Sequence, residues 1–198
     1  MKNIYQQAEF LLSVAKLEQL PEDEGYEVAF LGRSNAGKSS VLNKLTGIGG
    51  LARVSKTPGR TQLINYFGLD DSRRLVDLPG YGFAKVPIKM KHHWEQLIDQ
   101  YLQVRQSLQG LILVMDIRHP LRDFDKEILL WCVGSELPVH ILLNKVDKLS
   151  NSEIKKTLIE LDKSLSQFGA LVSYQTFSAL KGQGIDELKA TMNQWLAV

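Results

Sequence analysis

Residues 32–39 of the chain read GRSNAGKS and directly follow the apolar run EVAFL, residues 27–31. The two glycines allow the backbone to curl so that successive N–H groups point at one bound anion. The residues that follow, SSVLNKLTGI, have a helical pattern, and the positive end of a helix starting near Lys38 would add to the field at the loop. A strand, a glycine-rich loop and a helix in this order predict a phosphate-binding loop rather than a turn that matches the pattern by chance.

Two residues of this loop have specific expected roles. Lys38 is expected to bridge the β- and γ-phosphates of a nucleotide, and Ser39 to ligate Mg²⁺ through its hydroxyl. The predicted phosphate-loop contacts are Gly32, Arg33, Ser34, Asn35, Ala36, Gly37, Lys38 and Ser39.

A second anion-binding element is D-L-P-G, residues 77–80, at the end of the short apolar run RRLVDLP. Asp77 is expected to hold the Mg²⁺ shell through water, and the Gly80 N–H to reach the γ-phosphate. The motif is weak alone but gains weight from its place downstream of the phosphate loop. The predicted contacts are Asp77, Leu78, Pro79 and Gly80.

The motif N-K-V-D, residues 144–147, follows another apolar run and indicates which base is bound. Guanine presents two adjacent donors that one carboxylate, Asp147, can accept, whereas adenine would leave that carboxylate unpaired. The Lys145 stem can lie along the base, and Asn144 can either bond the base or tie loops together. The Ala179 N–H of F-S-A could bond guanine O6, with Ser178 shaping the loop. The predicted base contacts are Asn144, Lys145, Val146, Asp147, Phe177, Ser178 and Ala179.

Strand and helix patterns alternate along the chain. Buried strands are predicted at residues 27–31, 110–117, 137–145 and 170–179, and a hairpin at 61–69 and 73–79. Helical stripes run from Met90 to Leu108, from Ile154 to Phe168 and from Ile185 to Leu196. This order predicts an α/β domain with a mostly parallel six-stranded sheet, one antiparallel strand and helices on both faces. We expect one domain over residues 26–198, with residues 1–25 as an extension packed on it.

Composition limits the alternatives. The 198 residues, 44% hydrophobic and 23% charged, are typical of a globular protein. Neither a signal peptide nor an apolar stretch of about 20 residues is seen, so we expect no membrane contact. The single cysteine, Cys132, fits a buried small hydrophobe and a cytoplasmic location. Net charge is only +2, yet residues 33–91 hold eleven Lys and Arg against three Asp, a net of +8 that favours an anionic partner.

Taken together, these motifs resemble the translation-factor-related GTPases. The strings GRSNAGKSS, TPGRTQLINYF, DLPGYGFAKV and DIRHPLRDFD narrow the resemblance to the EngB (YihA/YsxC) family of bacterial GTPases, over residues 26–198. The resemblance implies a Ras-like P-loop GTPase domain that binds GTP or GDP with Mg²⁺, matures the large ribosomal subunit and is required for normal cell division and septation. One departure is Asn144, where many relatives carry threonine; the Lys145 and Asp147 contacts should remain.

The resemblance also places two switch segments. The first spans residues 46–61, where Thr57 and Thr61 compete as the Mg²⁺ ligand and Thr61 fits the family pattern better. Asn35 occupies the position where potassium-activated relatives bind that cation, so potassium activation is a hypothesis; loop shaping is the alternative. The contacts implied in the first switch are Gly59, Arg60, Thr61, Gln62 and Leu63, with Ser39 and Thr61 as metal ligands.

The second switch is residues 80–93, and it lacks an obvious catalytic base. Tyr81 stands where many GTPases carry a water-positioning glutamine, and the histidines at 92, 93 and 119 fit a surface role. We therefore expect slow intrinsic hydrolysis, assisted by a partner or by a monovalent cation.

The expected partner is the large ribosomal subunit or its precursor, bound by a monomer. Phosphate contacts would come from basic residues on the switches and the hairpin: Arg53, Lys56, Arg60, Lys85, Lys89, Lys91, Arg73 and Arg74. Two other readings stay open. One is a nucleotide-gated binding module with negligible hydrolysis; the other is a small ATP-dependent kinase, which N-K-V-D and F-S-A argue against.

Overall fold

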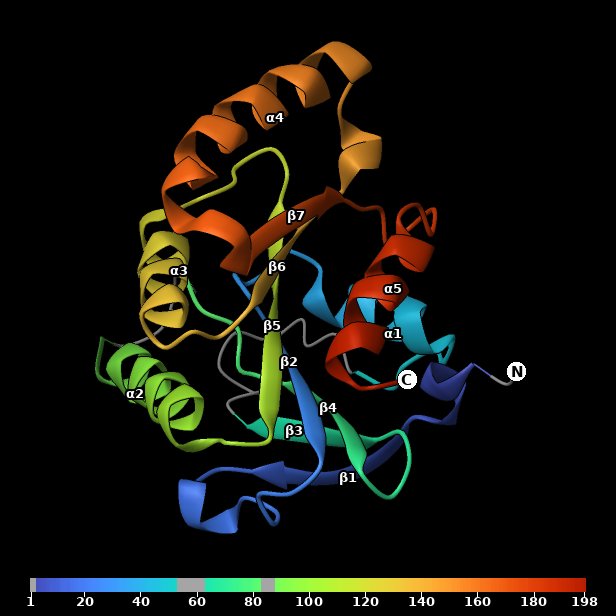
Figure 1. Ribbon diagram of the computed structural model, residues 1–198, viewed down its shortest axis with the longest axis vertical. Coiled ribbons are helices and arrows are strands. Elements are labelled where there is room, and N and C mark those ends of the chain that lie inside the picture. The colour runs from blue at the N-terminus through green and yellow to red at the C-terminus, as the bar shows by residue number, and fades with distance from the viewer. Residues whose placement is uncertain (1–2, 53–62, 83–87) are drawn as a thin grey trace.

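The predicted apolar strands pair into one sheet that has helices on both faces (Figure 1). This computed structural model describes residues 3–52, 63–82 and 88–198, apart from the side chains of residues 88–95. The strands are β1 (Glu9–Val14), β2 (Tyr26–Gly32), β3 (Ile64–Gly68), β4 (Arg73–Asp77), β5 (Leu108–Asp116), β6 (Val139–Asn144) and β7 (Val172–Thr176). Their order in the sheet is β1-β3-β4-β2-β5-β6-β7.

Five neighbouring strands, from β4 to β7 in that order, run parallel to one another. Only β3 runs the other way, antiparallel to both β1 and β4. The carboxyl ends of the parallel strands therefore meet at one edge, where α/β folds bind ligands. Each of the motifs 32–39, 77–80, 144–147 and 177–179 begins at this edge or directly after it.

The sheet has seven strands in the described part of the chain rather than the predicted six. The additional strand is β1, which lies in the stretch expected only to pack on the domain as an extension. It pairs from Glu9 with Gly68 to Val14 with Ile64, interrupted by a bulge between Phe10 and Leu12. Because Phe10 and Leu11 are exposed, the alternation of a half-buried strand is hard to recognise here.

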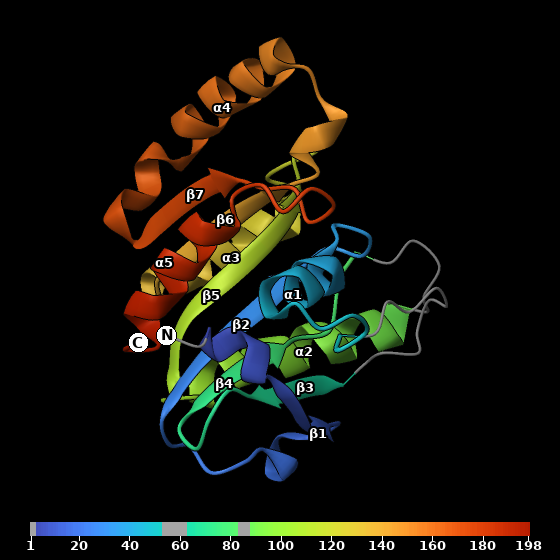
Figure 2. The same ribbon diagram turned by 90° about the vertical axis from the view of Figure 1, so that its right-hand side faces the viewer.

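The two faces of the sheet are covered by different helices (Figure 2). One face packs against α2 (Ile88–Val104), α3 (Asp123–Gly134) and α4 (Asn151–Leu165). The other packs against α1 (Lys38–Thr46) and α5 (Ile185–Trp195). Cys132 on α3 is fully buried, as predicted, and burial raises the pKa of its thiol to about 12. None of the helices among the described residues combines the length and apolar character needed to cross a bilayer.

The three helical stripes are confirmed as α2, α4 and α5, with three differences at their ends, one of which is that Leu196 lies just past the end of α5. Leu108, the last residue assigned to the first stripe, is the first residue of β5, and Phe168 lies beyond the end of α4. The stripes did not anticipate α3, whose second half, ILLWCVG, is apolar on nearly every side and shows no clear period.

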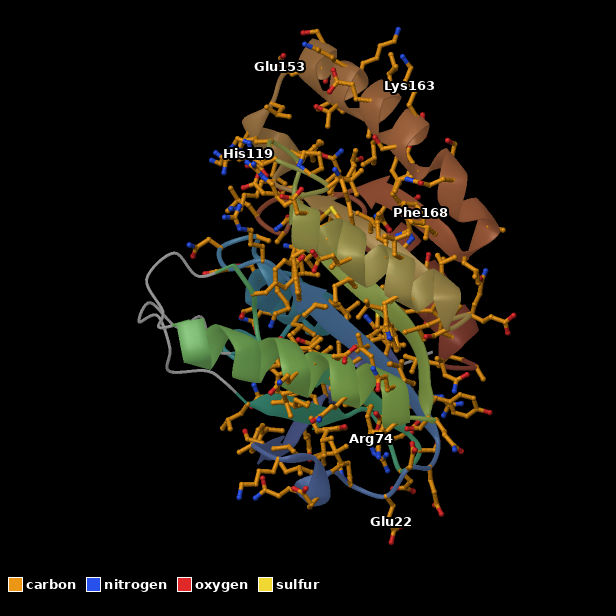
Figure 3. All side chains as sticks on the ribbon, turned by 90° about the vertical axis from the view of Figure 1, so that its left-hand side faces the viewer. Glu22, Arg74, His119, Glu153, Lys163 and Phe168 are labelled. Carbon is orange, nitrogen blue, oxygen red and sulfur yellow. The ribbon has the colours of Figure 1, made fainter. Side chains whose placement is uncertain are left out.

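The sheet edge opposite the motifs is held by a buried charge network around Glu27 on β2. Arg105, just after α2, donates to both carboxylate oxygens of Glu27 at 2.9 and 2.6 Å. Its Nη1 donates to the Pro21 carbonyl, and its Nη2, already bonded to Glu27, donates also to the Glu22 carbonyl. Figure 3 shows Glu22 and Arg74 at this end of the molecule and His119 at the other. The network joins the chain before β2 to the end of α2.

We predict that Arg105→Ala strongly destabilises the fold. Removing Arg105 leaves the buried Glu27 carboxylate with only the Arg74 guanidinium and the Tyr101 hydroxyl, each at 3.1 Å, which costs about 3 kcal/mol of unfolding free energy, the low end for a broken buried pair. Denaturant unfolding followed by circular dichroism measures this loss. Arg118→Ala is the matched control, because its bridge to Asp116 is exposed and should matter far less. Equal losses in both variants would contradict a special role for the buried pair.

Candidate nucleotide-binding site

The phosphate loop joins β2 to α1 and contains two residues in the left-handed region. Asn35 has φ +66° and Gly37 has φ +100°, and Gly37 is the residue that caps α1. The Ala36 N–H closes a turn on the Arg33 carbonyl at 2.9 Å. The free N–H groups of the first turn of α1 therefore follow directly on a tightly curled loop, which is the arrangement that binds phosphate.

A side chain at position 37 would have no space. A Cβ built there would stand 2.3 Å from the Asn144 amide nitrogen, which comes from the end of β6. Glycine is required at this position for two independent reasons, the positive φ and the close approach of the neighbouring loop.

Lys38 and Asp77 contact each other as an ion pair between Lys38 Nζ and Asp77 Oδ1. Asp77 is the last residue of β4, and Lys38 is the first residue of α1, so the pair joins the first two motifs. Ser39 follows in the first turn of α1. The hydroxyl and carboxylate oxygens of Ser39 and Asp77 are of the kind that Mg²⁺ prefers, so these residues fit the ion next to a nucleotide phosphate.

Asn144 ties the phosphate loop to the loop that follows β7. Its amide nitrogen donates to the Ala36 carbonyl at 2.9 Å, and its amide oxygen accepts from the Ala179 N–H at 3.1 Å. Of the two roles considered for Asn144, the structure shows the tie between loops. The Ala179 N–H, expected on guanine O6, here donates to Asn144.

Lys145 reaches back over the phosphate loop. Its ammonium donates to the Asn35 carbonyl at 2.5 Å and lies 3.0 Å from a carboxylate oxygen of Asp116, the last residue of β5. Although burial opposes it, hydrogen bonds from Arg118 and Lys145 hold the pKa of Asp116 well below its usual range. Asp116 was not among the predicted site residues; its place at the end of a predicted strand was the signal available.

Asp147 is held by the loop after β7. The Ser178 hydroxyl donates to Asp147 Oδ1 at 2.6 Å, and this bond lowers the pKa of the carboxyl below its ordinary value. Ser178 is fully buried, and its oxygen also accepts the Lys181 N–H at 3.1 Å. Ser178 therefore shapes the loop, as expected, and keeps Asp147 ionised as an acceptor. Val146 and Phe177 are buried behind it, joined by a backbone hydrogen bond.

The second switch begins at the same edge. Leu78 is fully buried, and its N–H donates to the Phe30 carbonyl of β2 at 3.0 Å. Pro79 and Gly80 follow at the mouth of the phosphate loop, since the next residue, Tyr81, bonds to Gly32 and Ser34. The Tyr81 side chain is buried and contacts Asp125 on α3.

Several predicted residues cannot be placed. Gly59, Arg60, Thr61 and Gln62 lie outside the described residues, as does Thr57, whereas Leu63 is half-buried directly before β3. The basic residues Arg53, Lys56 and Lys85 lie outside as well, and so do the side chains of Lys89, Lys91 and the histidines at 92 and 93. His119 is exposed, as its surface role predicted.

The hairpin arginines, predicted to face RNA, both have partners within the protein. Arg74 donates to the carbonyls of Glu22 and Glu24 and to the Glu27 carboxylate, so it belongs to the buried network at the opposite edge. Arg73 pairs with Asp70 and donates to the carbonyls of Leu196 and Ala197. Charge alone in the sequence does not reveal these partners.

Comparisons with known proteins agree with this geometry. A family model described as "50S ribosome-binding GTPase" matches residues 27–145. A curated relative, "Probable GTP-binding protein EngB" of Coxiella burnetii (strain CbuG_Q212), is 55% identical over 191 residues, 96% of this chain and 93% of the relative. The homologue from the RSA 493 / Nine Mile phase I strain is also 55% identical over 191 residues, with the same coverage of both chains.

Solved structures show the same fold. The crystal structure of a probable GTP-binding protein engB superposes with a TM-score of 0.70 at 23% identity, covering 86% of this chain and 98% of that one. Era in complex with MgGDPNP and nucleotides 1506–1542 of 16S ribosomal RNA superposes with a TM-score of 0.66 at 24% identity, covering 87% of this chain and 57% of that one.

We predict that Gly37→Ala abolishes tight nucleotide binding while the protein stays folded. The new methyl group must displace Asn144 and strain the backbone, so affinity should fall by at least about ten-fold. Titration of fluorescent GDP measures the affinity, and circular dichroism checks the fold. Gly134→Ala is the control, since a Cβ there meets nothing within 4 Å. Unchanged GDP affinity in Gly37→Ala would contradict the described loop geometry.

Proposed function

The chain belongs to the EngB family of P-loop GTPases, and from this membership we propose that it is a slow guanine-nucleotide switch in assembly of the large ribosomal subunit. The observation that carries the proposal is the Asn144 amide, which joins the phosphate loop to the loop that shapes Asp147. One residue thereby sets the spacing between phosphate and base contacts.

In this proposal the backbone N–H groups of residues 32–39 bind the phosphates of GTP or GDP. Lys38 contacts the β- and γ-phosphates, and Asp147 accepts the two guanine donors. Ser39 and Thr61 ligate Mg²⁺, with Asp77 in its outer shell; when bound, the ion neutralises charge that develops on the phosphates. The Lys38–Asp77 pair supports this, because both side chains already lie at the mouth of the loop.

Hydrolysis is proposed to be slow because none of the side chains described in the second switch, residues 80–82, is a glutamine or a histidine that could position water. Tyr81 occupies the glutamine position, and its ring is buried against Phe124 with its hydroxyl on Asp125. A partner or a monovalent cation beside Asn35 would supply the missing charge. The same observation supports a second candidate function, a nucleotide-gated binding module in which hydrolysis only resets the state or is negligible.

The proposed partner is the large ribosomal subunit or its precursor, bound by a cytoplasmic monomer. The description of the family model supports this choice, as does the basic character of the first and second switch segments. GTP would order these segments and so favour the binding of RNA phosphates. A requirement in normal cell division and septation is proposed from family membership.

We predict that purified protein binds precursor and mature 50S particles only with a non-hydrolysable GTP analogue, and that binding weakens as salt rises. Co-sedimentation across a salt series, with GDP-loaded protein and Gly37→Ala as controls, measures this. Binding that ignores the nucleotide would remove the argument for a ribosome switch while leaving the nucleotide site intact.

Intrinsic GTP hydrolysis should be well below about 1 s⁻¹, the low end of typical enzyme turnover. Phosphate release measured in potassium and in sodium buffers at equal ionic strength tests both rate and cation. Faster turnover in potassium supports a cation beside Asn35, and equal rates exclude it. Turnover near or above that limit for the protein alone would refute slow hydrolysis, and negligible multiple turnover with 50S particles would favour the binding module.

A further inference from the structure

Tyr81 directly follows D-L-P-G, and its side chain is buried against the start of α3. It is 4% exposed. Its hydroxyl donates to Asp125 Oδ1 on α3, and its ring packs on Phe124 with 4.6 Å between ring centroids. A polar ring end buried in this way requires a fixed partner, and Asp125 is that partner.

The backbone of Tyr81 is fixed to the phosphate loop at the same time. The Ser34 N–H donates to the Tyr81 carbonyl at 2.8 Å, and the Tyr81 N–H donates to the Gly32 carbonyl at 3.4 Å. The next residue, Gly82, has φ +70° and lies under the Arg33 side chain, where a Cβ would come within 2.7 Å of Arg33 Nε. Tyr81 therefore joins the phosphate loop, the second switch and α3.

Asp125 is itself held firmly. It is 2% exposed, and its second oxygen accepts the Arg122 N–H at 2.7 Å, so both carboxylate oxygens are used. Burial raises the pKa of the Tyr81 phenol well above its ordinary value, which keeps the hydroxyl protonated as a donor. The bond thus joins the second switch to a rigid helix of the core.

We propose that Tyr81 is a positioning residue whose bond to Asp125 holds the Gly80 peptide against the phosphate loop and so sets the preference for GTP over GDP. The inference rests on the proposed function, in which the Gly80 N–H contacts the γ-phosphate. GDP has no γ-phosphate, so its affinity does not depend on that peptide. Loss of the bond must therefore weaken GTP binding selectively.

The test is Tyr81→Phe, which removes one oxygen and keeps the ring on Phe124. Dissociation constants for GDP and for a non-hydrolysable GTP analogue are measured with Mg²⁺ present. Affinity for the analogue should fall about five-fold relative to affinity for GDP, the size of one net hydrogen bond. The matched control is Tyr174→Phe, which removes a hydroxyl that bonds Asp162 at 2.5 Å, between β7 and α4. That variant should leave both affinities unchanged.

Asp125→Asn gives a second, independent test. An amide has one oxygen, so it cannot accept both the Tyr81 hydroxyl and the Arg122 N–H through separate oxygens as the carboxylate does. Its loss of selectivity should match that of Tyr81→Phe, and the double variant should lose no more than Asp125→Asn alone, because both changes remove the same bond. If circular dichroism shows that Tyr81→Phe does not fold, the ratio of GTP-analogue to GDP affinity in Asp125→Asn tests the positioning role instead.

Either of two results would overturn the positioning role: both affinities unchanged, or an equal fold-fall in both, which a merely structural role would produce; each leaves the ratio of the two affinities unchanged. Failure of the proposed function looks different, because the unaltered protein would then bind neither guanine nucleotide. The affinity ratio thus separates the two hypotheses.

Discussion

The close contact between Gly37 and the Asn144 amide is the constraint on which the site depends. Only a residue without a Cβ lets β6 and its loop approach the phosphate loop to this distance. Asn144 can then hold the Ala36 carbonyl and the Ala179 N–H together. In the proposed function, this one side-chain amide sets the distance between the phosphate and base contacts by bonding backbone groups of both loops. In the same proposal, guanine selectivity and phosphate binding would both depend on this one packing contact.

The two ends of the sheet are stabilised in different ways. At the amino end, Glu27 and Arg105 form a buried, bidentate pair that joins the start of β2 to the end of α2. At the carboxyl end, positive φ angles at Asn35 and Lys145 place strained backbone in two loops of the candidate site, and Gly37 takes a positive φ that glycine adopts freely. Strain of this kind persists only where surrounding structure holds it. The buried charge network around Glu27 and the two apolar layers on either face of the sheet provide this structure at a distance from the candidate nucleotide-binding site.

The phosphate loop, D-L-P-G and N-K-V-D could be read from the sequence because their chemistry lies within a few consecutive residues. The parallel sheet could be predicted because strand and helix patterns alternate. The partners of Tyr81 and Arg74 could not, since Asp125 and Glu27 lie 44 and 47 residues away and pair only through the fold. The strand β1 was missed because its exposed Phe10 and Leu11 hide the alternation. The helix α3 was missed because apolar residues, including the exposed Leu130, occupy nearly every side of its second half and hide its period.

The same long-range partners change the meaning of the positive charge counted in the sequence. Lys38, Arg73 and Arg74 are neutralised by Asp77, Asp70 and Glu27 within the described structure. Of the eleven basic residues in 33–91, six lie on the first and second switch segments, and these remain as candidates for RNA contact. In the proposed function, the residues that bind RNA and the residues that contact the γ-phosphate would therefore lie in the same two switch segments. Linkage requires that such coupling be reciprocal: if GTP strengthens binding of the ribosomal particle, the particle must strengthen binding of GTP by the same factor.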